Sequence, residues 1–225
     1  MIPVCQCWDD GVASDARLVE VLRRFGAPAT FNLCPGTHSA RRTSGWKFRG
    51  EFPVWKLALG EFVAVYEGFD VANHSMNHPR LTSLPQSEAA REIQQARDSL
   101  EQIFGKPVTG FVYPFGDFDR DVAGLVADAG HTYARTTGGA ARLPAEDRVS
   151  IHPTVHFLSP EFWEEFDRCK VLGHPFYFWG HSYEMVSESH WSGLENMLSR
   201  ICGDPDVRWA GVQEVAGLLR ALHAG

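Results

Sequence analysis

Two short stretches of this sequence combine residue types that bind metal ions and transfer protons. Asp9 and Asp10 stand side by side, and the segment HSMNH places His74 and His78 four positions apart. Adjacent residues that leave a strand point in different directions, so one aspartate could bind a cation while its neighbour accepts a proton. If a helical turn begins at Asn73, both imidazoles lie on one face, with about 5–6 Å between their Cβ atoms.

Each motif alone also has a simpler explanation. Asp-Asp-Gly at 9–11 is favourable turn chemistry, and an aspartate there could cap a following helix. An isolated His-x-x-x-His pair is more often two exposed histidines than a metal site. The combination is more specific, because Asp10, His74 and His78 together supply three nitrogen and oxygen ligands. Such a set leaves one coordination position open for water, as catalytic zinc sites do.

Two further histidine segments have less certain roles. His181 follows the apolar run FYFW at 176–179 and is either a capping or core histidine, or a general acid opposite an aspartate base. The segment HPTVH at 152–156 repeats the four-residue spacing, but Pro153 interrupts it, so we do not expect a second metal there. The basic, aromatic loop at 41–49 could cover a cleft, although a solvated loop explains it equally well.

Alternating apolar runs and helical patterns predict the scaffold that would bring these residues together. Strands are expected at 2–8, 29–33, 69–73, 108–114, 132–136, 176–181 and 207–211, and helices at 14–26, 54–68, 87–105, 119–130, 159–173, 195–203 and from about 213. The stretch 35–53 is expected to be irregular. Such strand–helix alternation predicts an α/β fold with a parallel sheet, whose functional groups gather at the C-terminal ends of the strands. No phosphate-binding glycine motif occurs, which favours a barrel over a nucleotide-binding sheet.

Composition and charge limit the class of protein. The 225 residues, of which 44% are apolar, predict one domain over 1–225 with a sizeable core. The net charge of −7 and the scattered basic residues argue against nucleic acid as a partner. No stretch approaches the roughly 18 apolar residues of a membrane span, and no secretion signal begins the chain, so we expect a cytoplasmic protein. The five cysteines form no CxxC pair and are expected to be reduced core residues.

Taken in order, the segments WDDG, HSMNH, FVYPFG and WGH resemble the motifs of the polysaccharide deacetylase family, carbohydrate esterase family 4, whose shared unit is the NodB homology domain. The resemblance covers essentially the whole chain. It implies a distorted (β/α)7 TIM-like barrel and a hydrolase of linear amide C–N bonds that removes acetyl groups, mostly N-acetyl, from a carbohydrate. It also implies one divalent metal ion, with zinc expected and cobalt, nickel or manganese as alternatives.

By position, the resemblance implies a role for each charged residue of these motifs. Asp9 would be the catalytic base, and Asp10, His74 and His78 would be the metal ligands. His181 would be the general acid. The metal would polarise the acetyl carbonyl and its bound water, the base would take the water's proton, and the acid would protonate the leaving group.

The resemblance also implies a substrate-binding set. Tyr113, Pro114 and Phe115 of the third motif would contact the substrate, with the backbone N–H of Phe115 helping to hold the oxyanion. Trp179 of the last motif would form part of the pocket for the acetyl methyl group.

The chain departs from the family pattern in two places. Val112 stands where the family often has an arginine that orients the aspartate base, and Arg135 in YARTT is the expected substitute, because a guanidinium can hold a carboxylate through two hydrogen bonds. The alternative for Arg135 is a structural or surface salt bridge. The family's fourth motif is not recognisable, which leaves Glu184 and Asp117 as candidates for the carboxylate that orients the general acid.

Two other functions fit the same fold. A catalytically silent carbohydrate-binding module could have kept the barrel, although retention of both aspartates and all three motif histidines argues against it. A related amidohydrolase that acts on a non-sugar amide would have the same architecture.

Overall fold

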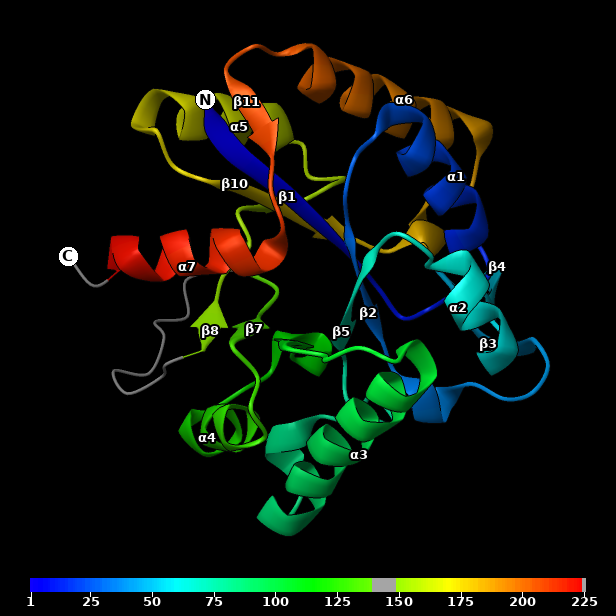
Figure 1. Cartoon of the computed structure of the whole chain (residues 1–225). Helices are drawn as coiled ribbons and strands as arrows, with labels where there is room; N and C mark the ends of the chain where they lie inside the picture. The colour runs from blue at the N-terminus through cyan, green and yellow to red at the C-terminus, as the bar shows by residue number, and fades with distance from the viewer. Residues whose placement is uncertain (139–148, 224–225) are drawn as a thin grey trace.

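A parallel β-sheet organises the computed structural model, which describes residues 1–138 and 149–223 (Figure 1). Its strands are β1 (Ile2–Asp9), β2 (Thr30–Leu33), β5 (Asp70–Asn73), β6 (Gly110–Val112), β7 (Tyr133–Arg135), β8 (Ser150–Ile151), β9 (Val155–His156), β10 (Phe176–Gly180) and β11 (Val207–Trp209). Their spatial order is β8-β7-β6-β5-β2-β1-β10-β9, and β11 pairs with the first residues of β1. Within the described residues the edge strands β8 and β9 form no ladder with each other, so the curled sheet stays open on one side. The result is a half-barrel, as expected of a distorted (β/α)7 fold.

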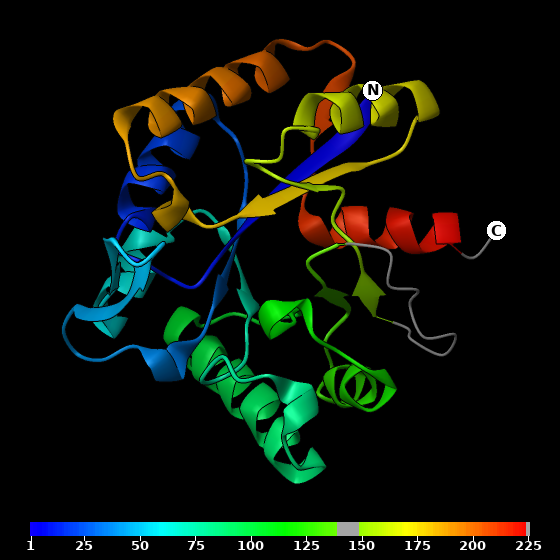
Figure 2. The same cartoon turned by 180° about the vertical axis from the view of Figure 1, so that it is seen from behind.

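Helices surround this sheet on its outer side and at one end (Figures 1 and 2). They are α1 (Asp15–Phe25), α2 (Phe62–Val65), α3 (Gln86–Phe104), α4 (Arg120–Asp128), α5 (Phe162–Leu172), α6 (Glu188–Gly203) and α7 (Val212–His223). In α3, the residues Ala89, Ile93, Ala96 and Leu100 recur every three or four positions and are buried, which gives the helix one apolar face. None of the helices in the described part of the chain is long and apolar enough to cross a membrane.

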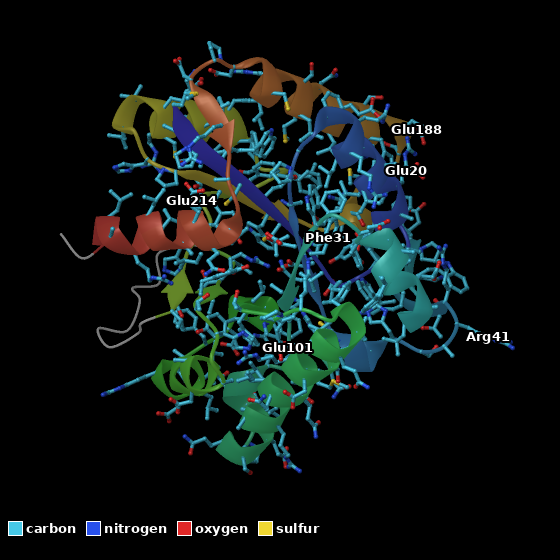
Figure 3. The ribbon with its side chains drawn as sticks, viewed as in Figure 1. Glu20, Phe31, Arg41, Glu101, Glu188 and Glu214 are labelled. Carbon is cyan, nitrogen blue, oxygen red and sulfur yellow. The ribbon has the colours of Figure 1, made fainter. Side chains whose placement is uncertain are left out.

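The central strand β1 supplies side chains to two cores because its residues alternate between the faces of the sheet. Val4 and Trp8 join the large core beneath the outer helices, where Phe31 of β2 is also buried (Figure 3). Cys7 faces the inside of the half-barrel and packs with Tyr177 of β10 and with apolar residues of α7. Two residues further along, Asp9 follows the same alternation and therefore also lies on the inner side.

The segment from 35 to 68 differs from its prediction. A hairpin of β3 (Thr43–Phe48) and β4 (Phe52–Lys56) replaces both the expected irregular stretch and the start of the expected helix at 54–68, whose only α-helical part is α2. Buried and exposed residues alternate through β4, which is the period of a strand. At the turn, Arg49 and Gly50 have φ of 52° and 72°, the left-handed backbone typical of tight hairpins.

The other predicted strands and helices are present with shifted ends. The largest shift is in α6, which begins at Glu188 instead of 195. The strands β8 and β9 were not predicted, because two residues are too few for an apolar period to be recognised.

Candidate active site and metal centre

The polar residues of the candidate site leave the sheet at one end. Because all ladders of the main sheet are parallel, the C-terminal ends of its strands lie together. The residues that end a strand or directly follow one are Asp9 and Asp10 of β1, Asn73 and His74 of β5, Arg135 of β7, His156 of β9 and His181 after β10.

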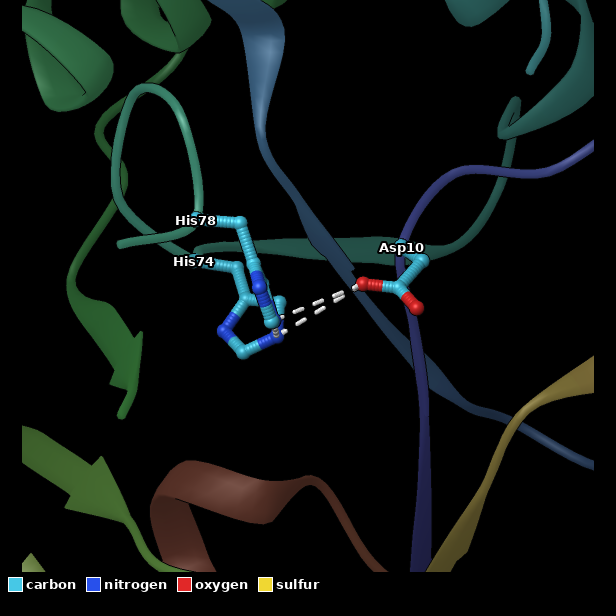
Figure 4. A group of neighbouring side chains, drawn as sticks. All are labelled: Asp10, His74 and His78. Carbon is cyan, nitrogen blue, oxygen red and sulfur yellow. Dashed lines mark hydrogen bonds and ion pairs between the residues drawn. The ribbon is translucent and has the colours of Figure 1, made fainter. Parts of the chain in front are cut away.

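Asp10, His74 and His78 form a compact group of potential metal ligands (Figure 4). The Nε2 atoms of His74 and His78 lie 3.1 Å apart, and they are 3.8 and 3.7 Å from Oδ1 of Asp10. Two nitrogens that each lie about 2.0–2.1 Å from one tetrahedral ion are separated by about 3.3 Å, so this spacing suits a shared cation. Figure 4 shows the two imidazoles side by side and turned toward the carboxylate.

The protonation of the two rings also suits metal binding. The Nδ1 atom of His74 lies 2.8 Å from the carbonyl oxygen of Val112, which accepts its N–H and leaves Nε2 with a free lone pair. Burial, aided by the neighbouring His78, lowers the pKa of His74 to about 4, and burial also lowers the pKa of His78. Both rings are therefore neutral near pH 7, the form in which imidazole binds a metal.

The two histidines are not held by a helical turn, so that expectation is wrong. Residues 74–80 form no helix, and Ser75 and His78 have φ of 63° and 57°. The side chain of Asn73 accepts the Ser75 N–H at 2.8 Å, and the Ser75 hydroxyl accepts the His78 N–H at 3.0 Å. These local side-chain bonds take the place of helical hydrogen bonds and turn both imidazoles toward Asp10.

Unusual backbone conformations gather around the same point. Asp10, His78 and Phe115 all have positive φ, at 83°, 57° and 62°. Such conformations cost about 1–3 kcal/mol each in non-glycine residues and are found mostly where a site must be held in place. The rings of His78 and Phe115 are also in contact, with centroids 4.6 Å apart.

Asp9 lies in a buried ion pair with Arg135, on the inner side of the half-barrel. The side chain of Asn32 donates to Oδ1 of Asp9 at 2.6 Å, and Arg135 donates to Oδ2. Burial would raise the pKa of Asp9, but the Arg135 guanidinium outweighs it and holds this pKa well below its usual range. Arg135 is fully buried and also lies over the Trp179 ring, 4.6 Å from its centroid. The structure thus places Arg135 against the carboxylate that it was expected to orient.

His181 is paired with a carboxylate from its own loop. Its Nδ1 lies 3.2 Å from Oε2 of Glu184, which also accepts the His181 backbone N–H at 3.0 Å. Its Nε2 lies 3.9 Å from Oδ2 of Asp9. Burial lowers the pKa of His181, but Glu184 and Asp9 outweigh this effect and raise it. Of the two carboxylates considered from the sequence, Glu184 occupies the orienting position, whereas Asp117 hydrogen-bonds to Thr82.

His156 extends this pair into a chain of three groups. Its Nε2 lies 2.9 Å from the same Glu184 oxygen. Burial would raise the pKa of Glu184, but hydrogen bonds from His156 and His181 lower it to about 2. Glu184 is therefore a partly buried anion between two imidazoles. His152, the other histidine of HPTVH, lies instead beside the Thr136 hydroxyl.

The predicted substrate-binding residues fall into two groups. Tyr113 is fully buried, its hydroxyl shares a hydrogen bond with Ser150, and Pro114 is buried as well. The side chains of these two residues therefore do not reach the cleft, which is a correction to their predicted contact with substrate. Phe115 is 52% exposed, and Trp179 is partly exposed between Arg135 and His156.

A cleft of about 530 Å³ opens beside the ligand group. Asp10, His78 and Phe115 line one part of it, and the β3–β4 hairpin lines another with Trp46 and Lys56. Backbone contacts of residues 11–13 hold β4 in place, because the Leu57 N–H donates to Gly11 and the Ala13 N–H donates to Trp55. The hairpin is thus fixed to residues 11–13, which directly follow Asp10 at the end of β1.

Comparison with known families agrees with this site. The polysaccharide deacetylase model matches residues 2–134, which include both aspartates and the HSMNH segment. Because the match covers more than half of the sequence, this chain belongs to the polysaccharide deacetylase family. The matched region ends before Arg135, His156 and His181. No curated protein sequence matches the chain.

Solved structures share the fold at low sequence identity. A predicted polysaccharide deacetylase from Mycobacterium smegmatis superposes with a TM-score of 0.72 at 16% identity, over 99% of this chain and 91% of the other. A family 4 carbohydrate esterase from Streptomyces lividans gives a TM-score of 0.62 at 16% identity, over 95% of each chain. A CE4 family pseudoenzyme gives 0.61 at 18% identity, over 95% of this chain and 67% of the other. The likeness establishes the fold, and since a pseudoenzyme shares it, the side chains must decide the activity.

Proposed function

We propose that this protein is a metal-dependent hydrolase that removes acetyl groups, N-acetyl groups in particular, from a carbohydrate. One observation supports this more than any other: Asp10, His74 and His78 converge within 4.8 Å of one another at the strand ends that also carry Asp9 and His181. Membership of the polysaccharide deacetylase family supports a sugar as the substrate.

Asp10, His74 and His78 would hold the cation, and zinc is the metal we expect, with cobalt, nickel or manganese as alternatives. A bound divalent cation would polarise the acetyl carbonyl and lower the pKa of the attacking water, which matters because Asp9 is a weak base. The backbone N–H of Phe115 is proposed to donate to the carbonyl oxygen as negative charge develops there.

Asp9 is proposed to accept the proton of the attacking water. Arg135 keeps its carboxylate ionised at every pH at which the enzyme would work. Each Asp9 oxygen accepts one hydrogen bond, from Asn32 or from Arg135, and retains a further acceptor position. The two donors therefore fix the carboxylate without using up its capacity to take a proton.

His181 is proposed to protonate the leaving nitrogen. The hydroxyl of the water adds to the acetyl carbon, the C–N bond breaks, and the proton passes from His181 to the amine, giving acetate and a free amino sugar. Glu184 holds the protonated imidazole in orientation. After the amine and acetate leave, Asp9 gives its proton to solvent and His181 takes one from solvent, which restores both groups. Trp179, which packs beside His181 with ring centroids 5.5 Å apart, is proposed to form the wall for the acetyl methyl group.

The first test measures bound divalent metal and acetate release. Purified protein is assayed with N-acetylglucosamine oligomers and O-acetylated xylan, before and after treatment with a chelator. We expect metal in the purified protein, and acetate release that disappears on chelation and returns when metal is added. Protein with neither metal nor activity would instead be a silent sugar-binding module, and turnover of non-sugar amides alone would make it a different amidohydrolase.

Substitutions then separate the proposed roles. Asp9→Asn should keep the metal but lower kcat by about 10²–10⁴-fold, the usual contribution of a general base. His78→Ala should lose both metal and activity, because it removes a ligand. His174→Ala, a partly exposed histidine outside the site, is the matched control and should change neither. Equal metal loss in the Asp9 and His78 variants would contradict this division of roles.

A further inference from the structure

The cleft contains a buried ammonium group that the proposed reaction does not use. Lys56 ends β4, its side chain lines the cleft, and the residue is only 8% exposed. Its Nζ donates to the Thr37 hydroxyl at 3.0 Å and lies 5.0 Å from the centroid of the Trp46 ring. Because β4 is held by the backbone of residues 11–13, this charge has a fixed position beside the ligand group.

No carboxylate in the described part of the chain lies within ion-pair distance, 4.0 Å, of Lys56 Nζ. Asp10 lines the same cleft, but its carboxylate faces His74 and His78 and is assigned to the cation. A buried ammonium with one neutral oxygen and one aromatic face as partners is less well stabilised than a paired one, and it retains donors for a ligand. The cleft therefore offers a positive charge that is able to bind an anionic group of a ligand.

Aromatic side chains surround this charge. Trp46 of β3 and Tyr183 of the loop after His181 both line the cleft, and their rings meet edge to face with centroids 5.2 Å apart. Phe48 supports the same tyrosine at 5.3 Å. Rigid aromatic faces suit the apolar C–H faces of a sugar ring, so the charge and the platform lie where one acidic sugar could contact both.

From this arrangement we infer that the preferred substrate is an acetylated sugar that carries an anionic group, a carboxylate or a phosphate, which Lys56 binds while the ring packs against Trp46. The inference rests on the proposed deacetylase function and names its substrate class. Thr37 supports the selection indirectly, as a positioning residue that holds the ammonium. Lys56 belongs to the hairpin and is assigned a binding role, whereas the proton transfers are assigned to Asp9 and His181.

The test compares pairs of substrates that differ in charge. N-acetylmuramic acid is matched with its methyl ester, and N-acetylglucosamine 6-phosphate with N-acetylglucosamine, so the two pairs distinguish a carboxylate from a phosphate. A charge-assisted hydrogen bond predicts that kcat/KM for the preferred acid exceeds that of its neutral partner by about 10-fold to 100-fold. The difference should lie mainly in KM, and it should shrink as ionic strength rises.

Lys56→Met should abolish this preference, measured as the ratio of kcat/KM between each acid and its neutral partner, whereas Lys56→Arg should keep most of it. Thr37→Val, which removes the oxygen beside the ammonium but not the charge, should give an intermediate preference. Lys47→Met is the matched control, because Lys47 is an exposed lysine of the same hairpin that does not line the cleft. Its preference for acids should equal that of the wild type.

Equilibrium binding of the same four sugars distinguishes failure of this inference from failure of the proposed function. If no sugar is deacetylated but the acids bind in a Lys56-dependent way, the anion site stands and the deacetylase proposal falls. If neutral and acidic sugars are deacetylated equally well, or if Lys56→Met retains the preference for acids, the inference is overturned and the deacetylase stands.

Discussion

Charged groups alternate in sign from the interior of the half-barrel to the mouth of the site. Arg135 contacts Asp9, Asp9 faces His181, and Glu184 holds the opposite nitrogen of His181. Each of these buried or partly buried groups thus has an oppositely charged neighbour, which offsets the penalty of removing a charge from water. The same neighbours lower the pKa of the proposed base and raise the pKa of the proposed acid, and both shifts favour the forms that the reaction requires.

Replacing Glu184 should expose this coupling in the pH profile. Glu184 raises the pKa of His181, and a general acid works only below its pKa, so Glu184→Gln should shift the alkaline limb of kcat/KM to lower pH. At pH 8 we expect kcat/KM to fall by about 10-fold, which is less than the roughly 10²–10⁴-fold that general acid catalysis contributes in full. Asp9, whose pKa Arg135 holds well below its usual range, should contribute no limb between pH 5 and 10 in either enzyme.

The pH profile from acetate release between pH 5 and 10 is the measurement. Glu164→Gln, an exposed glutamate of α5, serves as the control and should match the wild type. A Glu184→Gln enzyme that is slower by the same factor at every pH would show that Glu184 acts only on the structure of the loop.

Residues within short motifs were predictable one by one, whereas partners from distant segments were predictable only where both end strands of the same sheet. The grouping of Asp10, His74 and His78 was predictable because the residue types and strand ends are visible locally. Arg135 was predictable because it ends a strand of the same sheet. His156 was missed as a partner of Glu184, since their 28-residue separation carries no sequence signal, and Tyr113 looked accessible although its ring is part of the core.

Among the elements, the β3–β4 hairpin and the loop at 74–78 depend most on tertiary contacts. The sequence predicted a helix here because the residues from 54 to 65 are mostly apolar. The alternation of buried and exposed residues in β4 ends at Lys56, which is too short a stretch to indicate a strand. In the structure, backbone pairing with residues 11–13 favours the strand. In the loop, the sequence indicated that the two histidines lie side by side, but the expected helical geometry was wrong because Asn73 and Ser75 cap the backbone locally.

The hydrogen bonds of this loop lead to a prediction for the metal affinity of the protein. Ser75→Ala removes the oxygen that accepts the His78 N–H, while the strand before it and the helix after it keep their packing. Loss of a group that orients a ligand typically weakens metal binding by about 10-fold to 100-fold, so we expect a change of that size in the metal dissociation constant. Competition with a chromogenic chelator would measure it.

Ser87→Ala provides the comparison, because Ser87 is an exposed serine in the first turn of α3, away from the site. It should bind metal as the wild type does. Unchanged affinity in Ser75→Ala would show that the backbone of the loop, with His78 already at a φ of 57°, positions the ligand without the hydroxyl.

At the scale of the whole molecule, the half-barrel joins the two sides of the proposed metal centre. Asp10 follows β1 and His74 follows β5, and β2 lies between these two strands. The parallel sheet was predictable from the alternation of strands and helices, which also predicted that the ligands would share one end. The opening between β8 and β9 was not predictable, because it depends on how far a curled sheet with very short edge strands can close.

Metal binding should therefore stabilise the entire fold. A ligand at 100 times its dissociation constant adds about 2.7 kcal/mol to the free energy of unfolding. For a domain of this size, 1 kcal/mol corresponds to about 2–4 °C in Tm, so zinc should raise Tm by about 5–10 °C above the chelator-treated protein. Thermal unfolding followed by circular dichroism would detect this shift.

His74→Ala should lose the zinc-dependent rise in Tm. His190→Ala, which replaces a histidine that contacts Ser187 outside the site, should retain it. An equal rise in Tm for the His74 variant would mean that the ion stabilises the protein from another place, and the ligand assignment would have to be abandoned.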